Sequence, residues 1–118
     1  MSNTHVHHAI DYIEFSVTDM AKSKQFYGEV FRWTFNEYGP GYAGIQGEGR
    51  EQGGLRLDND VRPGGPLVVL YSINLDATLA SVRSAGGRIV KEPTPFPGGR
   101  RFHFTDPSGN ELAVWSEK

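Results

Sequence analysis

Two segments of the chain share one pattern of apolar and polar positions. Residues 12–19 and residues 68–76 each have the pattern of a strand, and each leads at once into an amphipathic helical pattern with a capping residue at its start. Asp19 and Asp76 stand near these starts, separated by close to half of the chain. The second helical pattern ends at Gly86-Gly87, a pair typical of a left-handed helix end. This repeat predicts a duplicated module, and we expect function in a groove shared by the two copies.

The first strand has two different faces. Its polar face carries Tyr12, Glu14 and Ser16, which we expect to remain free of core packing. Its apolar face should be covered by the helix that ends near Phe31. The strand residues and the helix stripe expected in this contact are Ile13, Phe15 and Val17 with Ser23, Phe26, Tyr27, Val30 and Phe31.

Turn formers divide the rest of the chain. Further strands are predicted at residues 33–35, 42–46, 54–57, 88–90, 101–105 and 111–115. Residues 93–99 hold three prolines and two glycines, so we expect an irregular loop there. The prediction is one α+β domain with module one at about 9–57, a connector at 58–66 and module two at about 67–117.

Composition excludes several function classes. The chain has 118 residues, of which 37% are hydrophobic and 22% charged, which suits one globular domain. A net charge of −2 gives no basis for expecting nucleic acid or a membrane surface as a partner. There is no cysteine, which excludes disulfides, thiolate metal sites and a thiol nucleophile. The sequence has no apolar stretch of membrane-spanning length and no signal-peptide pattern, so a cytoplasmic location is expected.

Three short motifs occur in a fixed order. They are Asp19 with Phe26-Tyr27-Gly28 downstream, Gly86-Gly87 after the second helix, and Asp106-Pro107-Ser108-Gly109-Asn110 before the last strand. Together they resemble the vicinal oxygen chelate superfamily, the group of glyoxalases, bleomycin-resistance proteins and extradiol dioxygenases. The resemblance covers nearly the whole chain. It implies two βαβββ modules, each curling an open sheet around half of a cavity, and commonly a homodimer.

The same resemblance bears on metal binding. Metal-dependent members place a ligand in the first strand, in the strand that opens the second module, and in the last strand. Those positions fall here on Tyr12, at or near Val68, and on Ala113. Valine and alanine side chains have no donor atoms, and tyrosine is an uncommon ligand. The resemblance therefore implies that the usual metal site is absent, and no cofactor is predicted.

Polar and aromatic residues remain on the expected groove faces. Glu14 and His103 are the candidate catalytic pair, because imidazole titrates near neutrality and a desolvated carboxyl group becomes a better base. In the ordinary alternative, both groups are only solvated or ion-paired. A second alternative is a relocated divalent metal site. Its ligands would be Glu14, His103 and Glu111. The expected ligand-binding residues are Tyr12, Ser16, Arg101, Glu111 and Trp115.

Three functions are compatible with this sequence. The leading one is binding of a small organic ligand without a metal, as in drug-resistance members of the superfamily. The alternative is a glyoxalase-like lyase or isomerase that uses Glu14 and His103 as acid and base. The third is a structural or regulatory dimer whose groove is filled by its own side chains. His5, His7 and His8 precede the first strand, where a frayed tail is expected and metal binding is the alternative.

Overall fold

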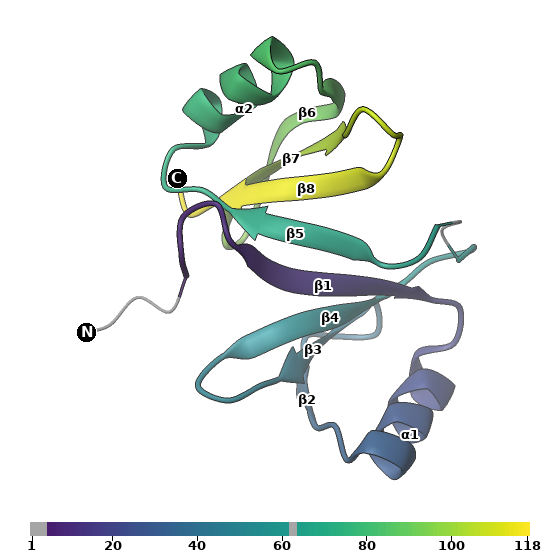
Figure 1. The fold of residues 1–118 in the computed structure, drawn as a ribbon. Coiled ribbons are helices and arrows are strands. Elements are labelled where there is room, and N and C mark those ends of the chain that lie inside the picture. Colours follow the sequence, from purple (N-terminus) through teal and green to yellow (C-terminus); the bar gives the residue numbers. More distant parts are fainter. Residues whose placement is uncertain (1–4, 62–63) are drawn as a thin grey trace. The chain divides into compact units, whose positions relative to one another are not determined.

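The computed structural model describes residues 5–61 and 64–118 (Figure 1). A strand, a helix and three strands occur twice in succession, so the predicted α+β fold class with two βαβββ modules is confirmed. The elements are β1 Ile10–Val17, α1 Met20–Phe31, β2 Phe35–Glu37, β3 Tyr42–Gln46, β4 Glu51–Leu57, β5 Leu67–Tyr71, α2 Leu75–Ser84, β6 Arg88–Phe96, β7 Gly99–Thr105 and β8 Glu111–Ser116. Arg62 and Pro63 of the predicted connector lie outside the described residues. Within the described ranges, neither helix has the length and apolar character needed to cross a membrane.

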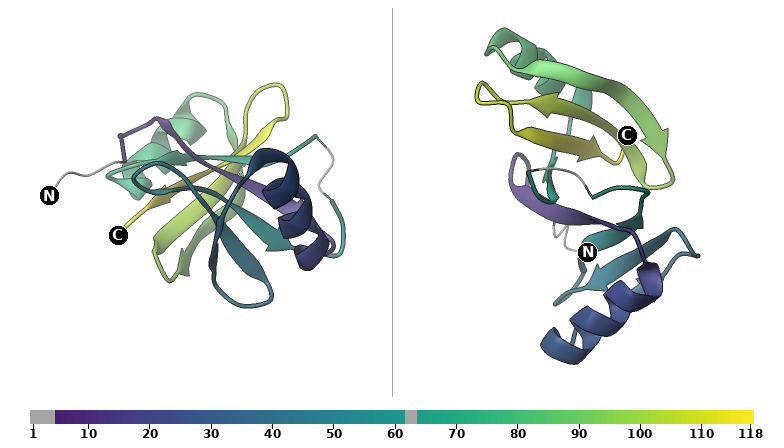
Figure 2. Two further views of the ribbon diagram at one scale, coloured as in Figure 1. Left: turned by 90° about the horizontal axis from the view of Figure 1, so that it is seen from below. Right: turned by 90° about the vertical axis from the view of Figure 1, so that its right-hand side faces the viewer.

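The chain divides into two compact units. Among the described residues, the first unit is Tyr12–Pro66, and the second is Leu67–Lys118 with residues 5–11. The first unit has the strand order β2-β3-β4-β1, with β4 and β1 parallel and the other pairs antiparallel. The second has the order β5-β8-β7-β6, with β5 and β8 parallel. Figure 2 shows β6 and β7 of this unit as one long hairpin.

The core of the first unit lies between its sheet and α1. Val17, Ile45 and Leu55 are buried, and five partly buried apolar residues pack on them: Phe15, Met20, Tyr27, Trp33 and Phe35.

The expected contact of the whole α1 stripe with this core is wrong. Phe26, Val30 and Phe31 are 54–56% exposed, and Ile13 on the strand is 38% exposed. The helix ends at Arg32 in the left-handed conformation, and Trp33 then folds back to stack on Tyr27 with ring centroids 4.7 Å apart. We attribute the exposure of the helix stripe to this returning indole, which packs on the core in its place.

The second unit has its own core, between α2 and the sheet. Leu75, Phe102 and Val114 are almost fully buried, and the apolar residues packed on them are Leu70, Leu79, Val82, Ile89 and Phe104. α2 contacts β6, β7 and β8 (Figure 1). Its N-cap is Asn74, whose side chain accepts a hydrogen bond from the Ala77 backbone N–H.

Three predicted element boundaries are wrong. The strand opening the second unit ends at Tyr71, so Asp76 lies within the first turn of α2 and is not its cap. The second strand begins at Phe35 because Trp33 belongs to the core contact described above. Residues 93–96, expected in an irregular loop, continue β6. β6 is the outermost strand of its unit, where a proline that lacks an N–H donor is tolerated.

Candidate functional site

One cross-strand row of the second unit contains both His103, a candidate catalytic residue, and Ala113, an expected metal-ligand position. Val69 of β5 is aligned with Ala113 of β8, Ala113 with His103 of β7, and His103 with Lys91 of β6. Aligned residues share a face of the sheet, and this face is opposite to the one covered by α2. The resemblance places the opening-strand position at or near Val68, which is aligned with Leu112. Its neighbour Val69 is the residue that is aligned with Ala113 and shares its face.

His103 and Glu111 form a hydrogen-bonded pair on this face. His103 Nδ1 lies 2.9 Å from Glu111 Oε2, and the His103 residue is only 6% exposed. The other ring nitrogen, Nε2, is buried and has no hydrogen-bond partner within residues 5–61 and 64–118. Burial lowers the pKa of His103 below its usual 6.5, and the positive charges of Arg101 and Lys91 lower it further against the opposing effect of Glu111. The neutral ring is therefore favoured.

The second unit also contains a cluster around a buried carboxylate, Asp11. Asp11 is 6% exposed; one of its oxygens accepts from Trp115 Nε1 at 2.9 Å, and the other lies 2.8 Å from His5 Nδ1. The His5 ring stacks on Tyr71 and meets Trp115 edge-on, each with centroids 5.0 Å apart. Asp11 was missed at the sequence level. The available signal was its numbering: Asp11 falls on the same strand face as the apolar residues Ile13, Phe15 and Val17.

The expectation of a frayed histidine tail is wrong for the described residues. In addition to the contact of His5 with Asp11, His7 Nδ1 accepts the Ile73 N–H at 3.0 Å. His8 Nε2 lies 3.1 Å from Thr78 Oγ1 in α2. The segment before β1 is thus bound to its unit by side-chain contacts, because its three imidazoles meet polar groups of β1 and of the α2 start.

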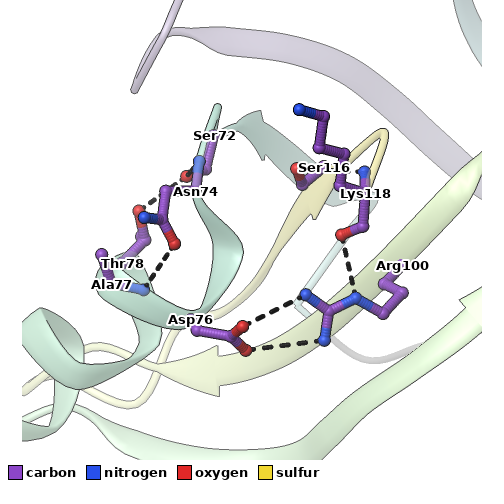
Figure 3. A network of polar contacts seen from close by, with 8 residues as sticks. All are labelled: Ser72, Asn74, Asp76, Ala77, Thr78, Arg100, Ser116 and Lys118. Atoms are coloured by element: carbon purple, nitrogen blue, oxygen red, sulfur yellow. Dashed lines mark hydrogen bonds and ion pairs between the residues drawn. The ribbon is translucent and has the colours of Figure 1, made fainter.

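The start of α2 is held by a polar network (Figure 3). The Ser72 hydroxyl accepts from the Asn74 N–H at 2.9 Å and lies 2.8 Å from the Thr78 hydroxyl. Arg100 reaches Asp76 with both terminal nitrogens, at 3.5 and 3.4 Å, and donates from Nε to the Lys118 carbonyl at 2.9 Å. These contacts satisfy the helix terminus and its neighbours, so we assign this network to structure.

The first unit presents a second polar face. Glu14 of β1, Gly54 of β4, Gly44 of β3 and Asn36 of β2 are aligned across the sheet. A Cβ atom on Gly54 would lie 2.0 Å from the Tyr42 hydroxyl oxygen. A Cβ atom on Gly44 would lie 1.8 Å from a carboxylate oxygen of Glu51, which lies over that glycine in the same way. The two glycines therefore make room for large polar side chains on the sheet.

A chain of hydrogen bonds runs over these glycines. Tyr42 donates to buried Glu14 at 3.0 Å and lies 2.8 Å from the Tyr12 hydroxyl, which donates to Glu51 at 3.0 Å. Tyr38 and Asn36 also donate to Glu51, at 2.7 and 3.0 Å. Burial is the main cause that raises the pKa of the Tyr12 and Tyr42 hydroxyls well above 10. Both tyrosines therefore stay protonated and serve as donors. Glu51 is not among the site residues predicted from the sequence.

The predicted site residues thus occur in two separate sets. Tyr12, Glu14 and Ser16 belong to the first unit, with Ser16 aligned with Arg56, and the others belong to the second unit. The carboxylate that contacts His103 is Glu111. No group of three or more histidine, aspartate or glutamate side chains that could hold a metal ion occurs in the part of the chain that the structure describes.

A family model decides the classification. The model of the Glyoxalase/Bleomycin resistance protein/Dioxygenase superfamily matches residues 9–114. The chain belongs to this superfamily. None of the curated proteins matches it.

Solved structures with the same fold include several enzymes of the superfamily. A Mn(II)-bound glyoxalase from Novosphingobium aromaticivorans is 27% identical with a TM-score of 0.72, and the match covers 96% of this chain and 40% of that one. Methylmalonyl-CoA epimerase from Mycobacterium tuberculosis is 17% identical with a TM-score of 0.74, covering 98% and 92%. An extradiol ring-cleaving dioxygenase from B. fuscum is 18% identical with a TM-score of 0.73, covering 97% and 33%. The last two show the fold alone, and the chain spans well under half of the glyoxalase and of the dioxygenase.

The usual metal positions of the superfamily do not fit a metal in this member. Val69 is 3% exposed and Ala113 is 0% exposed, and neither side chain has a donor atom. The Tyr12 hydroxyl is engaged by Tyr42 and Glu51. These residues therefore do not supply the three ligands of the usual set.

Proposed function

We propose that this superfamily member binds a small organic molecule without a metal at the usual positions, as drug-binding resistance members do. The observation that carries the proposal is the pair of buried, donor-free side chains, Val69 and Ala113, at two of those positions. A site built from such residues holds its ligand by apolar contact and by a few polar groups.

The face of the second unit that carries His103 is the proposed binding surface. It supplies a buried ring nitrogen without a partner among the described residues, next to the Glu111 carboxylate. Arg101 and Trp115 are aligned with each other on the same two strands as His103 and Ala113. A cationic group and an indole at this position suit a flat polar molecule. Tyr12 and Ser16 are proposed ligand contacts on the first unit, taken by itself.

The test is a thermal-shift screen of small organic compounds on protein stripped of metal with a chelator. A ligand at about one hundred times its Kd should stabilise the fold by about 2.7 kcal/mol, and equally so before and after chelation. His103→Ala should weaken this stabilisation, and His7→Ala serves as the matched histidine control. A stabilisation that requires one bound metal ion per chain would overturn the proposal.

A second candidate function is proton transfer in a lyase or isomerase reaction. The His103–Glu111 pair favours it, because a carboxylate beside an imidazole is the usual arrangement of a histidine base. The proposal names His103 and Glu14 as the acid–base groups. It is tested by NMR detection of α-proton exchange in a panel of carbonyl compounds in D₂O. His103→Ala and Glu14→Gln should each abolish the exchange without unfolding the protein, and unchanged rates in both variants would exclude it.

A further inference from the structure

The contact between His103 and Glu111 fixes more than the position of the ring. Glutamate is ordinarily ionised at neutral pH, and an ionised carboxylate has no hydrogen to donate. The hydrogen in the 2.9 Å contact must then belong to His103 Nδ1. Glu111 lies at the start of β8, aligned with Thr105, and so reaches His103 diagonally across the β7–β8 pair.

The electrostatic surroundings favour a neutral ring. The charged groups facing His103 are Glu111 from β8, Arg101 from its own strand and Lys91 from β6. Val69 and Ala113 on the same row are apolar. A neutral imidazole carries one hydrogen, and Nδ1 holds it here, so Nε2 presents a lone pair.

An acceptor atom buried without a partner carries a desolvation penalty, which a donor can remove. Nε2 is such an atom within the described ranges. We propose that Glu111 is a positioning residue that holds His103 in the Nδ1–H tautomer, and that the ligand of this face is a molecule that donates an O–H or N–H to Nε2. This inference rests on the proposed function, since it defines the class of ligand that the face takes.

The two positive charges narrow this class further. Arg101 and Lys91 oppose a cationic donor such as an alkylammonium group, whereas the Glu111 carboxylate beside the ring attracts one. Because the two positive charges outnumber the one negative charge, the ligand class that we infer is a neutral donor: an alcohol, an amide, an N–H heterocycle or an undissociated weak acid. A molecule that only accepts hydrogen bonds would leave two lone pairs facing each other.

The tautomer can be measured without any ligand. Nitrogen-15 NMR of histidine-labelled protein at neutral pH should show His103 with its hydrogen on Nδ1. Glu111→Ala should shift the ring towards the Nε2–H form, whereas Glu111→Gln, which keeps an acceptor oxygen, should largely preserve the wild-type form. If a Glu111 variant unfolds, the signals of its other histidines will show it. In that case the tautomer of His103 in the wild-type protein decides the test. An Nε2–H ring in the wild type would overturn the inference, even if small molecules bind.

The ligand class is tested with indole and 1-methylindole. These differ in the donor N–H, and neither has a conventional acceptor. Indole should shift the Nε2 resonance of His103, and 1-methylindole should bind about tenfold more weakly with no such shift. Equal binding of both probes, or of neither, would overturn the donor requirement. Neither result bears on the proposed function itself, which fails if the compound screen finds no ligand or finds only ligands whose binding requires a metal ion.

Discussion

Gly54→Ala should destabilise the first unit strongly for so small a change. The added Cβ would lie 2.0, 2.3 and 2.7 Å from the Oη, Cζ and Cε2 atoms of Tyr42, so the ring must move. That movement breaks the 3.0 Å hydrogen bond from Tyr42 to Glu14, a carboxylate that is only 7% exposed. Loss of a hydrogen bond to a charged group and local overpacking each cost about 1–3 kcal/mol. We therefore expect a loss of about 2–6 kcal/mol in the free energy of unfolding.

Urea denaturation followed by circular dichroism measures this loss. Gly41→Ala is the matched control, because a Cβ atom there meets nothing within 4 Å, and its effect should stay within about 1 kcal/mol. The double variant Gly54→Ala/Tyr42→Ala should be more stable than the sum of the single losses predicts, since removing the ring removes the collision. If Gly54→Ala proved as harmless as Gly41→Ala, the proposed role of the glycine under the tyrosine ring would be refuted.

Three further predictions concern the second unit. Burial lowers the pKa of His103, so as the pH falls below 6.5 the unfolded chain binds its proton first. The free energy of unfolding should therefore decrease in mild acid, and His103→Gln should remove this part of the pH dependence in urea titrations at several pH values. Asn74→Ala removes the cap of α2 and should cost about 1 kcal/mol by the same assay; an unchanged stability would contradict the capping role. Trp115→Phe keeps a ring but removes the donor to buried Asp11. The free energy of unfolding should fall by about 1.5–3 kcal/mol, and the thermal midpoint should fall with it.

The elements were predictable where local chemistry decides them. The residue pattern placed β3 at 42–46. In the turn from Asp106 to Asn110, Asp106 accepts the Ser108 and Asn110 N–H groups, and Gly109 has a φ of 94°. Strand alternation also predicted correctly that His103 lies on the sheet face opposite to the core residues Phe102 and Phe104.

The remaining differences depend on tertiary contacts that the pattern of a strand or helix does not show. The position of Trp33 on Tyr27 is a tertiary contact, and no local pattern shows that it leaves the α1 stripe exposed. The pairing of His5 with Asp11 likewise joins a tail to a strand. The resemblance placed a ligand position at or near Val68 without fixing its strand face, and only the alignment with β8 shows that Val69 shares a face with Ala113.

The outermost strand of the second unit has a consequence for how copies of the chain can meet. β6 lacks N–H donors at Pro93 and Pro95, and its register with β7 shifts at two places. Lys91 lies between the two register shifts and adds a positive charge to the strand. An incoming strand needs a regular row of donors and acceptors, which this edge does not offer. The strand should therefore resist edge-to-edge aggregation. Copies of the chain that associate are expected to do so through side-chain surfaces and not by extending the sheet along β6.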